Sequence, residues 1–406
     1  MENHTDRYKW YILALAFLTD MVVVAIPSMG LAVLAKEISQ DLQLDLVQFG
    51  VVWGISSVPS IITSLLGGSL GDRLGAKRML ILSALLSGLL VAARGLANDF
   101  FSLGLIILLG GALVPFVTMN AIKAAGQWFP RHQLGLANGA LGMGMALGFM
   151  LGTLLSDSVL SPLLGGWRNV FLLYGLIGAG LAIPWYFAKE PPQTLVSRMQ
   201  NTSVRRSFQQ VIRVKNIWLM GFLMLGVAGS VQGVLGYLPL YLRNLGWSPI
   251  QADKTVSAFH FVSMLFVLPI AIWSDRLGSR KRLLIFSALM IILGSGLLGL
   301  LGGGLILPAV LMAGFVRDSF MAILFATTIE MEGVGPNLAG TAVGFVTGIG
   351  SIGNVLAPPI GNSLVRFFPA APFLFWSMLA FLGLVCLLQI KQKAKLGSSL
   401  TLEPGE

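Results

Sequence analysis

The chain has 406 residues, of which 55% are hydrophobic and only 11% are charged, and its formal net charge is +10. A soluble domain carries about 25% charged residues, and a chain this apolar could not hide its surface from water, which excludes a soluble globular protein. The single cysteine, Cys386, also excludes an intramolecular disulfide.

Twelve apolar runs are long enough to cross a membrane, because a helix needs roughly 20 residues to span a ~30 Å hydrocarbon core. We therefore expect an all-α, multi-pass membrane protein. The first run begins at residue 10 and is too long for the apolar segment of a cleavable signal. The expected spans are 10–35, 46–70, 78–97, 101–128, 134–156, 168–188, 216–241, 254–273, 282–301, 304–329, 338–364 and 371–390.

Lysine and arginine predict the orientation of these spans. If both termini are cytoplasmic, 19 of the 27 basic residues lie in cytoplasmic segments and six lie in external loops or at external helix ends, among them Arg94 and Arg243. This bias follows the positive-inside rule and predicts a protein of the plasma (inner) membrane. The positive charge is thus a topology signal with weak contact to anionic lipids, and it does not indicate nucleic-acid binding.

A long polar stretch divides the chain at its midpoint, with six spans on each side. It includes four arginines and a short amphipathic pattern around Val204–Val214 that predicts a helix on the membrane surface. The expected organisation is an N-terminal bundle at 1–188, a cytoplasmic linker at 189–215, a C-terminal bundle at 216–390 and a cytoplasmic tail at 391–406.

The two halves repeat each other. The loop after the second run contains the sequence GDRLG at 71–75, and the loop after the eighth run contains SDRLG at 274–278. Glycine and alanine positions in the fifth run also match positions in the eleventh run. A repeat of half the chain length predicts two pseudo-symmetric six-helix bundles, which is a known design of transporters.

These loops resemble the hallmark loop of the major facilitator superfamily, and the sequence GWR at 166–168 is similar to that family's entry to its sixth span. The resemblance implies the twelve-helix fold and secondary transport by alternating access. No phosphate-binding loop, zinc-spaced His/Cys set or defensible Ser-His-Asp arrangement is present. We therefore expect no enzyme activity, no cofactor and no metal, and a transport reaction that gradients drive.

The hallmark loops predict a gate between the halves. An aspartate next to the positive end of a neighbouring helix is stabilised by the helix dipole. The resemblance implies that Asp72 meets the start of the eleventh span and that Asp275 meets the start of the fifth. Glu330 is a candidate partner for Arg276 or Arg282. The alternative is that these charges only set topology. The expected gating residues are Asp72, Arg73, Arg78, Asp275, Arg276 and Glu330.

Charged residues deep in a span cost about 2.5–3.5 kcal/mol or more and usually face a cavity or a partner. Asp20, Arg317 and Asp318 lie near the middle of their spans, and the resemblance places the first, fourth, seventh and tenth spans around a central cavity. The expected substrate and coupling residues are Arg317, Asp318, Asp20, Lys123, Asn120, Gln232 and Tyr237. His260 is a candidate proton relay, although packing is the commoner role for such a histidine.

Two kinds of function remain open at this point. The first is proton-coupled transport by a monomer of a small organic or inorganic anion, in which Arg317 binds the anion and Asp20 or Asp318 takes the proton, since arginine keeps its own proton. Its rival within transport is an exporter of cationic or amphipathic drugs that uses Asp20 and Asp318. A non-transporting receptor or scaffold would need neither loop. An aspartate that only neutralises Arg317 is the structural alternative.

Overall fold

The computed structural model describes residues 2–130, 133–189, 204–276, 280–300 and 305–390. Within these ranges all regular structure is helical, and twelve helices are long and apolar enough to cross a membrane. The predicted all-α fold with twelve spans is therefore confirmed. Some side chains inside these helices lie outside the described part of the structure, among them those of Asp72, Arg73, Asp275 and Arg276.

The first six spans form one bundle, called here the N-half, and each span begins close to the predicted residue. Its elements are α1 (Glu2–Thr19), the π-helix η1 (Asp20–Ala25), α2 (Ile26–Val33), α3 (Ala35–Asp41), α4 (Leu46–Ile55), α5 (Ser57–Leu74), α6 (Ala76–Arg94), α7 (Phe100–Trp128), α8 (Leu134–Leu155), the π-helix η3 (Ser156–Leu160), α9 (Ser161–Leu164), α10 (Trp167–Gly180) and α11 (Ala182–Phe187).

The last six spans form the second bundle, the C-half. The short helix α12 precedes it, at the place where the amphipathic pattern predicted a helix. Its elements are α12 (Val204–Val211), α13 (Lys215–Asn244), α14 (Pro249–Arg276), α15 (Arg280–Leu300), α16 (Ile306–Phe315), α17 (Arg317–Ile329), α18 (Gly335–Ser363), the 3-10 helix η6 (Leu364–Arg366) and α19 (Ala371–Gln389).

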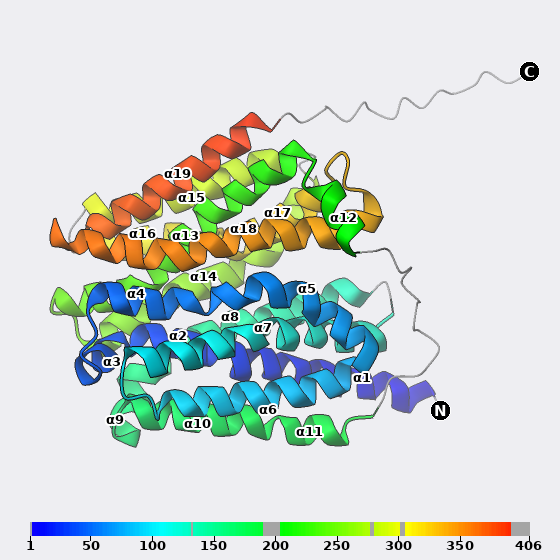
Figure 1. Ribbon diagram of the computed structural model, residues 1–406, viewed down its shortest axis with the longest axis horizontal. Helices are drawn as coiled ribbons and strands as arrows, with labels where there is room; N and C mark the ends of the chain where they lie inside the picture. The colour runs from blue at the N-terminus through cyan, green and yellow to red at the C-terminus, as the bar shows by residue number, and fades with distance from the viewer. Residues whose placement is uncertain (1, 131–132, 190–203, 277–279, 301–304, 391–406) are drawn as a thin grey trace, which may run out of the picture.

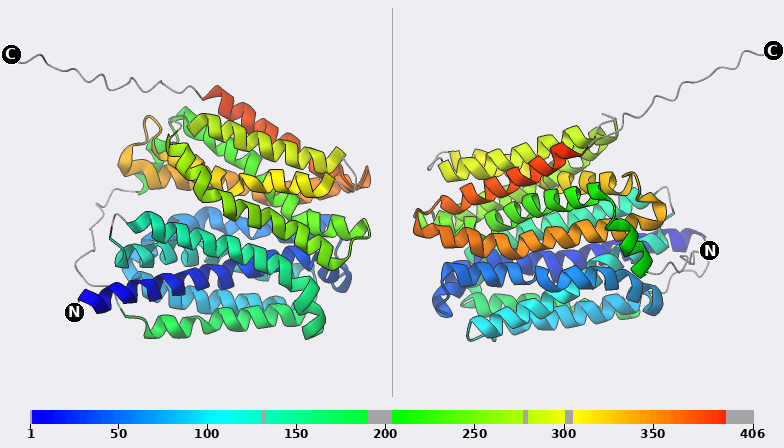
Figure 2. Two further views of the ribbon diagram at one scale, coloured as in Figure 1. Left: turned by 180° about the vertical axis from the view of Figure 1, so that it is seen from behind. Right: turned by 45° about the horizontal axis from the view of Figure 1, so that its top comes forward.

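The two halves lie side by side with their helices roughly parallel to one another (Figures 1 and 2). The N-terminus and α12 lie at the same end of the molecule, and the opposite end, called here the distal end, carries α3 and α9 (Figure 1). The halves meet where α4 and α5 pack on α18 and where α8 packs on α14. Spans two and eleven and spans five and eight therefore form the interface between the halves.

The halves are in close contact near the distal end. A Cβ atom added to Gly50 would lie 2.8 Å from the backbone of Pro359, so only glycine permits this approach of α4 to α18. Nearby, the Asn362 side chain donates a hydrogen bond of 2.8 Å to the carbonyl of Leu46. These contacts hold spans two and eleven together on the distal side of the molecule.

Spans one and ten are irregular near their middle, as is span two, where Ser56 separates α4 from α5. Span one passes through the π-helix η1, which begins at Asp20. Span ten is interrupted at Val316, whose φ of −113° and ψ of −2° separate α16 from α17. Such irregular backbone is tolerated at membrane depth only where protein or a cavity surrounds it, and it often marks a site of function. Both predicted midplane charges, Asp20 and the Arg317–Asp318 pair, lie at these irregularities.

Spans five and eight are longer than predicted. Span five continues to Leu164 instead of ending near residue 156, and span eight begins at Pro249 instead of residue 254. Each extension contains one acidic residue, Asp157 or Asp253, and both are buried. A charge normally marks the end of a span, and here an ion pair described below keeps both carboxylates inside the protein.

Candidate functional site

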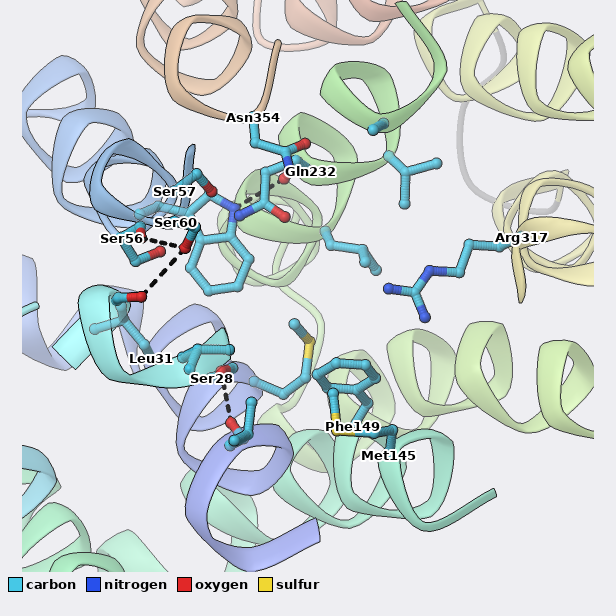
Figure 3. Close-up of a pocket in the computed structure, with 18 of the residues that line it drawn as sticks. Ser28, Leu31, Ser56, Ser57, Ser60, Met145, Phe149, Gln232, Arg317 and Asn354 are labelled. Atoms are coloured by element: carbon cyan, nitrogen blue, oxygen red, sulfur yellow. Dashed lines mark hydrogen bonds between the residues drawn. The ribbon is translucent and has the colours of Figure 1, made fainter. Parts of the chain in front are cut away.

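A cavity of about 320 Å³ lies between the two halves (Figure 3). Spans one to five of the N-half and spans seven, nine, ten and eleven of the C-half contribute to its lining. This volume is at the small end of the range for ligand pockets, roughly 300–1,000 Å³, so it suits a small solute. Of the predicted cavity residues, Arg317 and Gln232 line it.

Arg317 points into this cavity from the C-half (Figure 3). Its Nη1 atom lies 2.5 Å from Oδ1 of Asp318, and its Cζ atom lies 5.2 Å from the ring centre of Phe149 in the N-half. Its Nε atom is buried and has no hydrogen-bond partner. Among the described residues the guanidinium therefore has an anionic partner and an aromatic partner, and its enclosed Nε has none.

Arg317 and Asp318 form an ion pair although they are consecutive residues of α17. The side chains of consecutive residues in a helix point about 100° apart, so a pair such as Arg317 and Asp318 does not normally meet. Because Asp318 lies in the first turn of α17, its backbone N–H has no acceptor within the helix and donates to the hydroxyl of Ser263 at 3.1 Å. The Ser263 hydroxyl donates in turn to Oδ2 of Asp318 at 2.7 Å. Span eight thus holds the carboxylate beside Arg317.

Arg94 also lines the cavity, which corrects the expectation that it lies at the external membrane surface. Its Nη1 atom donates to the carbonyl of Pro27 at 3.1 Å, and its Cζ atom lies 5.4 Å from the ring centre of Phe171. Within the described part of the chain it forms no ion pair, and its buried Nε atom has no partner. Counting residues along the span could not predict this, because the side chain reaches inward from the end of α6.

Uncharged polar side chains line the part of the cavity that faces Arg317 in Figure 3. They come from spans one, two, seven and eleven, and they are Ser28, Ser56, Ser57, Ser60, Gln232 and Asn354. The indole N–H of Trp53 donates to the backbone carbonyl of Gln232 at 2.8 Å, which joins span two to span seven at the cavity wall. Phe149 and Met145 provide apolar surface between the two sides (Figure 3).

Asp20 is buried but does not line the cavity. It is 2% exposed, and its Oδ1 atom has no hydrogen-bond partner. No ion pair joins it to Arg317, whose described carboxylate partner is Asp318. The two aspartates that the sequence singled out therefore have different surroundings. Asp318 is paired with Arg317, although it does not itself line the cavity, whereas Asp20 is enclosed by the helices of the N-half.

Three further predicted cavity residues do not line this cavity. Tyr237 is buried on the other side of span seven, where its hydroxyl donates to the carbonyl of Pro369 at 3.0 Å. Asn120 donates to the carbonyl of Phe116 in its own helix at 2.8 Å, and Lys123 is partly buried one turn further on. The spans were predicted correctly, but the face that each presents to the cavity depends on helix rotation, which the sequence did not define.

His260 lies beside the site. It is 1% exposed, and neither ring nitrogen has a hydrogen-bond partner. Its ring lies 5.4 Å from that of Phe149 and 5.3 Å from that of Phe259, centre to centre. The contact with Phe149 places His260 on the aromatic residue that also contacts Arg317. Packing is its evident role in this structure, and a proton relay through it stays a prediction.

The predicted gate is described only in part. The side chains of Asp72, Arg73, Asp275 and Arg276 lie outside the described residues, and that of Arg78 is exposed. Glu330 forms an ion pair of 2.7 Å with Arg280, which is neither of the two arginines expected as its partner. The Asp72 and Asp275 latches therefore stay predictions.

The sequence analysis did not predict a buried cluster of charged side chains at the distal end. Arg243 of span seven is 7% exposed, and its Nη2 atom lies 2.7 Å from Oδ2 of Asp157 and 2.6 Å from Oδ1 of Asp253. Its Nη1 atom also donates to the carbonyl of Val33. Asp157 and Val33 belong to the N-half, so one arginine of the C-half binds the opposite bundle twice. An arginine and two aspartates at predicted span ends were the only signal in the sequence.

Known proteins resemble the chain along most of its length. A model of the Major Facilitator Superfamily matches residues 12–358. The chain is similar to a gallate transporter of Pseudomonas putida, with 25% identity over 91% of this chain and 88% of that protein. It is also similar to the 4-hydroxybenzoate transporter PcaK of Pseudomonas aeruginosa, with 25% identity over 88% of this chain and 86% of that protein.

The fold is likewise known. A bacterial homologue of the human lysosomal transporter Spinster, solved in an inward-facing and unoccupied conformation, superposes with a TM-score of 0.75. That alignment covers 94% of this chain and 95% of the other, at 16% sequence identity. At this identity the likeness establishes the fold, and the two halves described above are those of that fold.

Proposed function

Because the chain belongs to the Major Facilitator Superfamily and is a multi-pass secondary transporter, we propose that it carries a small organic anion by alternating access, coupled to protons. Arg317 is the anchor of the anion. The observation that carries the proposal is the position of Arg317 in the central cavity, paired with Asp318. The similarity to transporters named for gallate and 4-hydroxybenzoate, both carboxylates, supports an anionic substrate.

The ion pair supplies the coupling step. An arginine stays charged in proteins and must find an anion when it is held away from bulk water. In the empty carrier this anion is Asp318, at 2.5 Å from Nη1. A substrate carboxylate competes for the same guanidinium, and an aspartate that has lost its cation then accepts a proton more readily. Ser263 holds Asp318 in place during this exchange.

Asp20 is the second candidate for the proton. It is enclosed, and the structure gives its Oδ1 atom no partner. Because it does not line the cavity, a role for Asp20 would be in the movement of the proton and not in the binding of the anion. The two aspartates can therefore be separated by experiment, because only Asp318 touches the anchor.

The charges of the cavity do not favour the export of cations. Arg317 and Arg94 both line it, and among the described residues Asp318 is the carboxylate paired there. A cationic substrate would meet two positive charges and would be repelled. The small volume, about 320 Å³, also disfavours large amphipathic drugs.

The proposed cycle places both termini in the cytoplasm of a monomer in the plasma membrane. The distal end is then external, and the described contacts of Gly50, Asn362 and Arg243 belong to a carrier that is closed to the outside. We further propose that the Asp72 and Asp275 loops latch the cytoplasmic side when the carrier faces outward. The distal contacts would then form when the carrier faces inward, and the latches would form when it faces outward.

Transport assays in proteoliposomes test the proposal. The purified protein is reconstituted, and uptake of labelled 4-hydroxybenzoate and gallate is measured with and without an inward proton gradient. We expect uptake that the gradient stimulates, that Arg317→Ala abolishes and that Arg317→Lys weakens through loss of the bidentate fork. Arg366→Ala is the matched control, because Arg366 is exposed and far from the cavity. Uptake by Arg317→Ala equal to that of the control would contradict the proposal.

A further inference from the structure

We infer that Arg94 forms a second anion-binding pole on the N-half side of the cavity, so that the preferred substrate carries oxygen acceptors at both ends, with dicarboxylates bound most tightly. This inference rests on the proposed function, because it takes Arg317 as the pole for the first carboxylate. It adds a binding residue and a substrate class to the site.

Arg94 is a cation with no anionic partner among the described residues. Its contacts in the described structure are neutral: the carbonyl of Pro27 at 3.1 Å and the ring of Phe171 at 5.4 Å. A carbonyl and an aromatic face compensate part of the cost of holding a guanidinium away from water. They leave its full positive charge unbalanced, and its buried Nε atom has no partner. A charge at this depth is costly and usually indicates function.

The space in front of Arg94 is open to a ligand. A Cβ atom added to Gly110 would have Nη2 of Arg94 as its one neighbour, at 3.9 Å, so this nitrogen lies beside a residue without a side chain. Gly110 lines the cavity, as do Arg94 and Ser28, which follows Pro27. The hydroxyl of Ser28 donates to the carbonyl of Val24 at 2.6 Å, and its oxygen can still accept a hydrogen bond. On this wall the donors of Arg94 suit a carboxylate or a hydroxyl group, and the Ser28 oxygen can accept from a hydroxyl group.

Charge balance favours two carboxylates. Arg317 and Arg94 line the cavity and Asp318 is paired with Arg317, which leaves one positive charge in excess. When the substrate displaces Asp318 and this aspartate takes a proton, two positive charges remain. A dicarboxylate neutralises both, and a hydroxycarboxylate neutralises one and hydrogen-bonds to the other. An unsubstituted monocarboxylate leaves Arg94 with the carbonyl of Pro27 alone, so it lacks the binding free energy that a second acceptor group contributes.

The part of the cavity between Arg317 and Arg94 suits a ligand whose middle is apolar. Phe149 and Met145 lie between Arg317 and the serines in Figure 3, and the cavity holds about 320 Å³. A pocket of this kind takes a ligand on the order of one ring or a short chain, with few polar groups that fix its orientation. The substrate class is therefore a short or single-ring carbon frame with acceptors at its two ends.

Binding of matched ligand series tests the inference. The affinities of the purified full-length protein are measured by isothermal titration for benzoate, 4-hydroxybenzoate and terephthalate, and for butyrate, 4-hydroxybutyrate and succinate. Two frames are used because the inference concerns the end groups. In at least one series we expect the dicarboxylate to bind about tenfold or more tightly than the plain acid, as charged hydrogen bonds contribute roughly 1.5–3 kcal/mol, with the hydroxy acid between them.

The variant Arg94→Gln should erase this ranking, so that the dicarboxylate and the hydroxy acid bind no more tightly to it than the plain acid does. Arg94→Lys, which keeps the charge, should retain a reduced preference, and it replaces Arg94→Gln if the glutamine variant fails to fold. Arg366→Gln is the matched control. An arginine that only fastens span three to Pro27 would change stability and leave the ranking intact.

The outcomes separate the two proposals. If plain acids bind and Arg317→Gln removes this binding, but a second end group adds no affinity or the ranking survives in Arg94→Gln, the second pole is wrong and the proposed function stands. If none of the six acids binds, or if Arg317→Gln binds them normally, the anion site itself is wrong and the second pole falls with it.

Discussion

Arg243 of span seven and Asp157 of span five form an ion pair of 2.7 Å that joins the two halves of the transporter at their distal ends. Asp253 shares the same guanidinium nitrogen at 2.6 Å, and the side chains of all three are at most 9% exposed. Buried pairs are costly to break from one side, because the remaining charges lose their partner. Arg243 therefore controls how firmly the distal end is closed.

Arg243→Gln should open the distal end. The variant leaves two buried carboxylates without a cation, at a cost of about 3–5 kcal/mol in the closed state. Spin labels attached at Leu96 and Phe367, which are exposed in distal connections of opposite halves, report the separation in a Cys386→Ser background. We expect longer distances than in Lys254→Gln, a control at an exposed neighbour of Asp253. An unchanged distance distribution would show that the cluster does not close this end.

Gly50→Ala should also prevent distal closure, for a steric reason. The added methyl group would lie 2.8 Å from the backbone of Pro359, closer than side chains approach in real structures. The same pair of labels should therefore move apart, and uptake should slow. Gly142→Ala is the control, since a Cβ atom there meets nothing within 4 Å. Equal distances in both variants would mean that α4 and α18 can separate slightly at no cost to closure.

Asp318→Asn and Asp20→Asn should have different effects. Asp318→Asn removes the carboxylate that competes for Arg317, so substrate affinity should lose its dependence on pH and the proton gradient should no longer stimulate uptake. Asp20→Asn should leave substrate affinity within about twofold, because Asp20 does not line the cavity, and should act only on transport. Affinity measured between pH 5.5 and 8, together with uptake, checks both, and a loss of affinity in Asp20→Asn would contradict the assignment.

Asp72→Asn should impair transport while the protein still inserts and folds. The prediction follows from the hallmark loop, in which a carboxylate next to a helix N-terminus stabilises the outward-facing state. Arg78→Gln provides a comparison within the predicted gate, since Arg78 belongs to the same sequence motif and is exposed at the start of α6. Uptake is measured at equal protein levels, as judged by fluorescence-detected gel filtration. Normal uptake by a well-folded Asp72→Asn protein would make the latch dispensable.

Hydropathy and the internal repeat were sufficient to predict the fold. Apolar runs reveal spans directly, because backbone groups in lipid must be satisfied within a helix. The predicted boundaries failed where a charge was buried: Asp157 and Asp253 lie inside longer helices because Arg243 compensates them. Such a partner comes from another span, and the sequence of one span cannot reveal it.

The sequence could predict how far along each span the site residues lie, but not the direction in which their side chains point. Arg317 was expected near the middle of span ten, and the structure places it in the cavity. Tyr237 and Asn120 lie on cavity-forming spans and yet face elsewhere, because helix packing sets the rotation of each span. Arg94 was missed for the opposite reason, since its long side chain carries the charge far from its backbone position.

The contact between Arg317 and Phe149 has a consequence for how binding and movement are linked. The guanidinium carbon lies 5.2 Å from the ring centre, and the two residues belong to opposite halves. A guanidinium that turns toward an incoming anion changes its attraction to the facing bundle in the same event. Binding of an anion at Arg317 therefore acts directly on the interface between the two halves, without a chain of intermediate residues. Substitutions in loops far from the cavity should therefore change the rate of the transport cycle. They should have less effect on how strongly the conformational change depends on bound substrate.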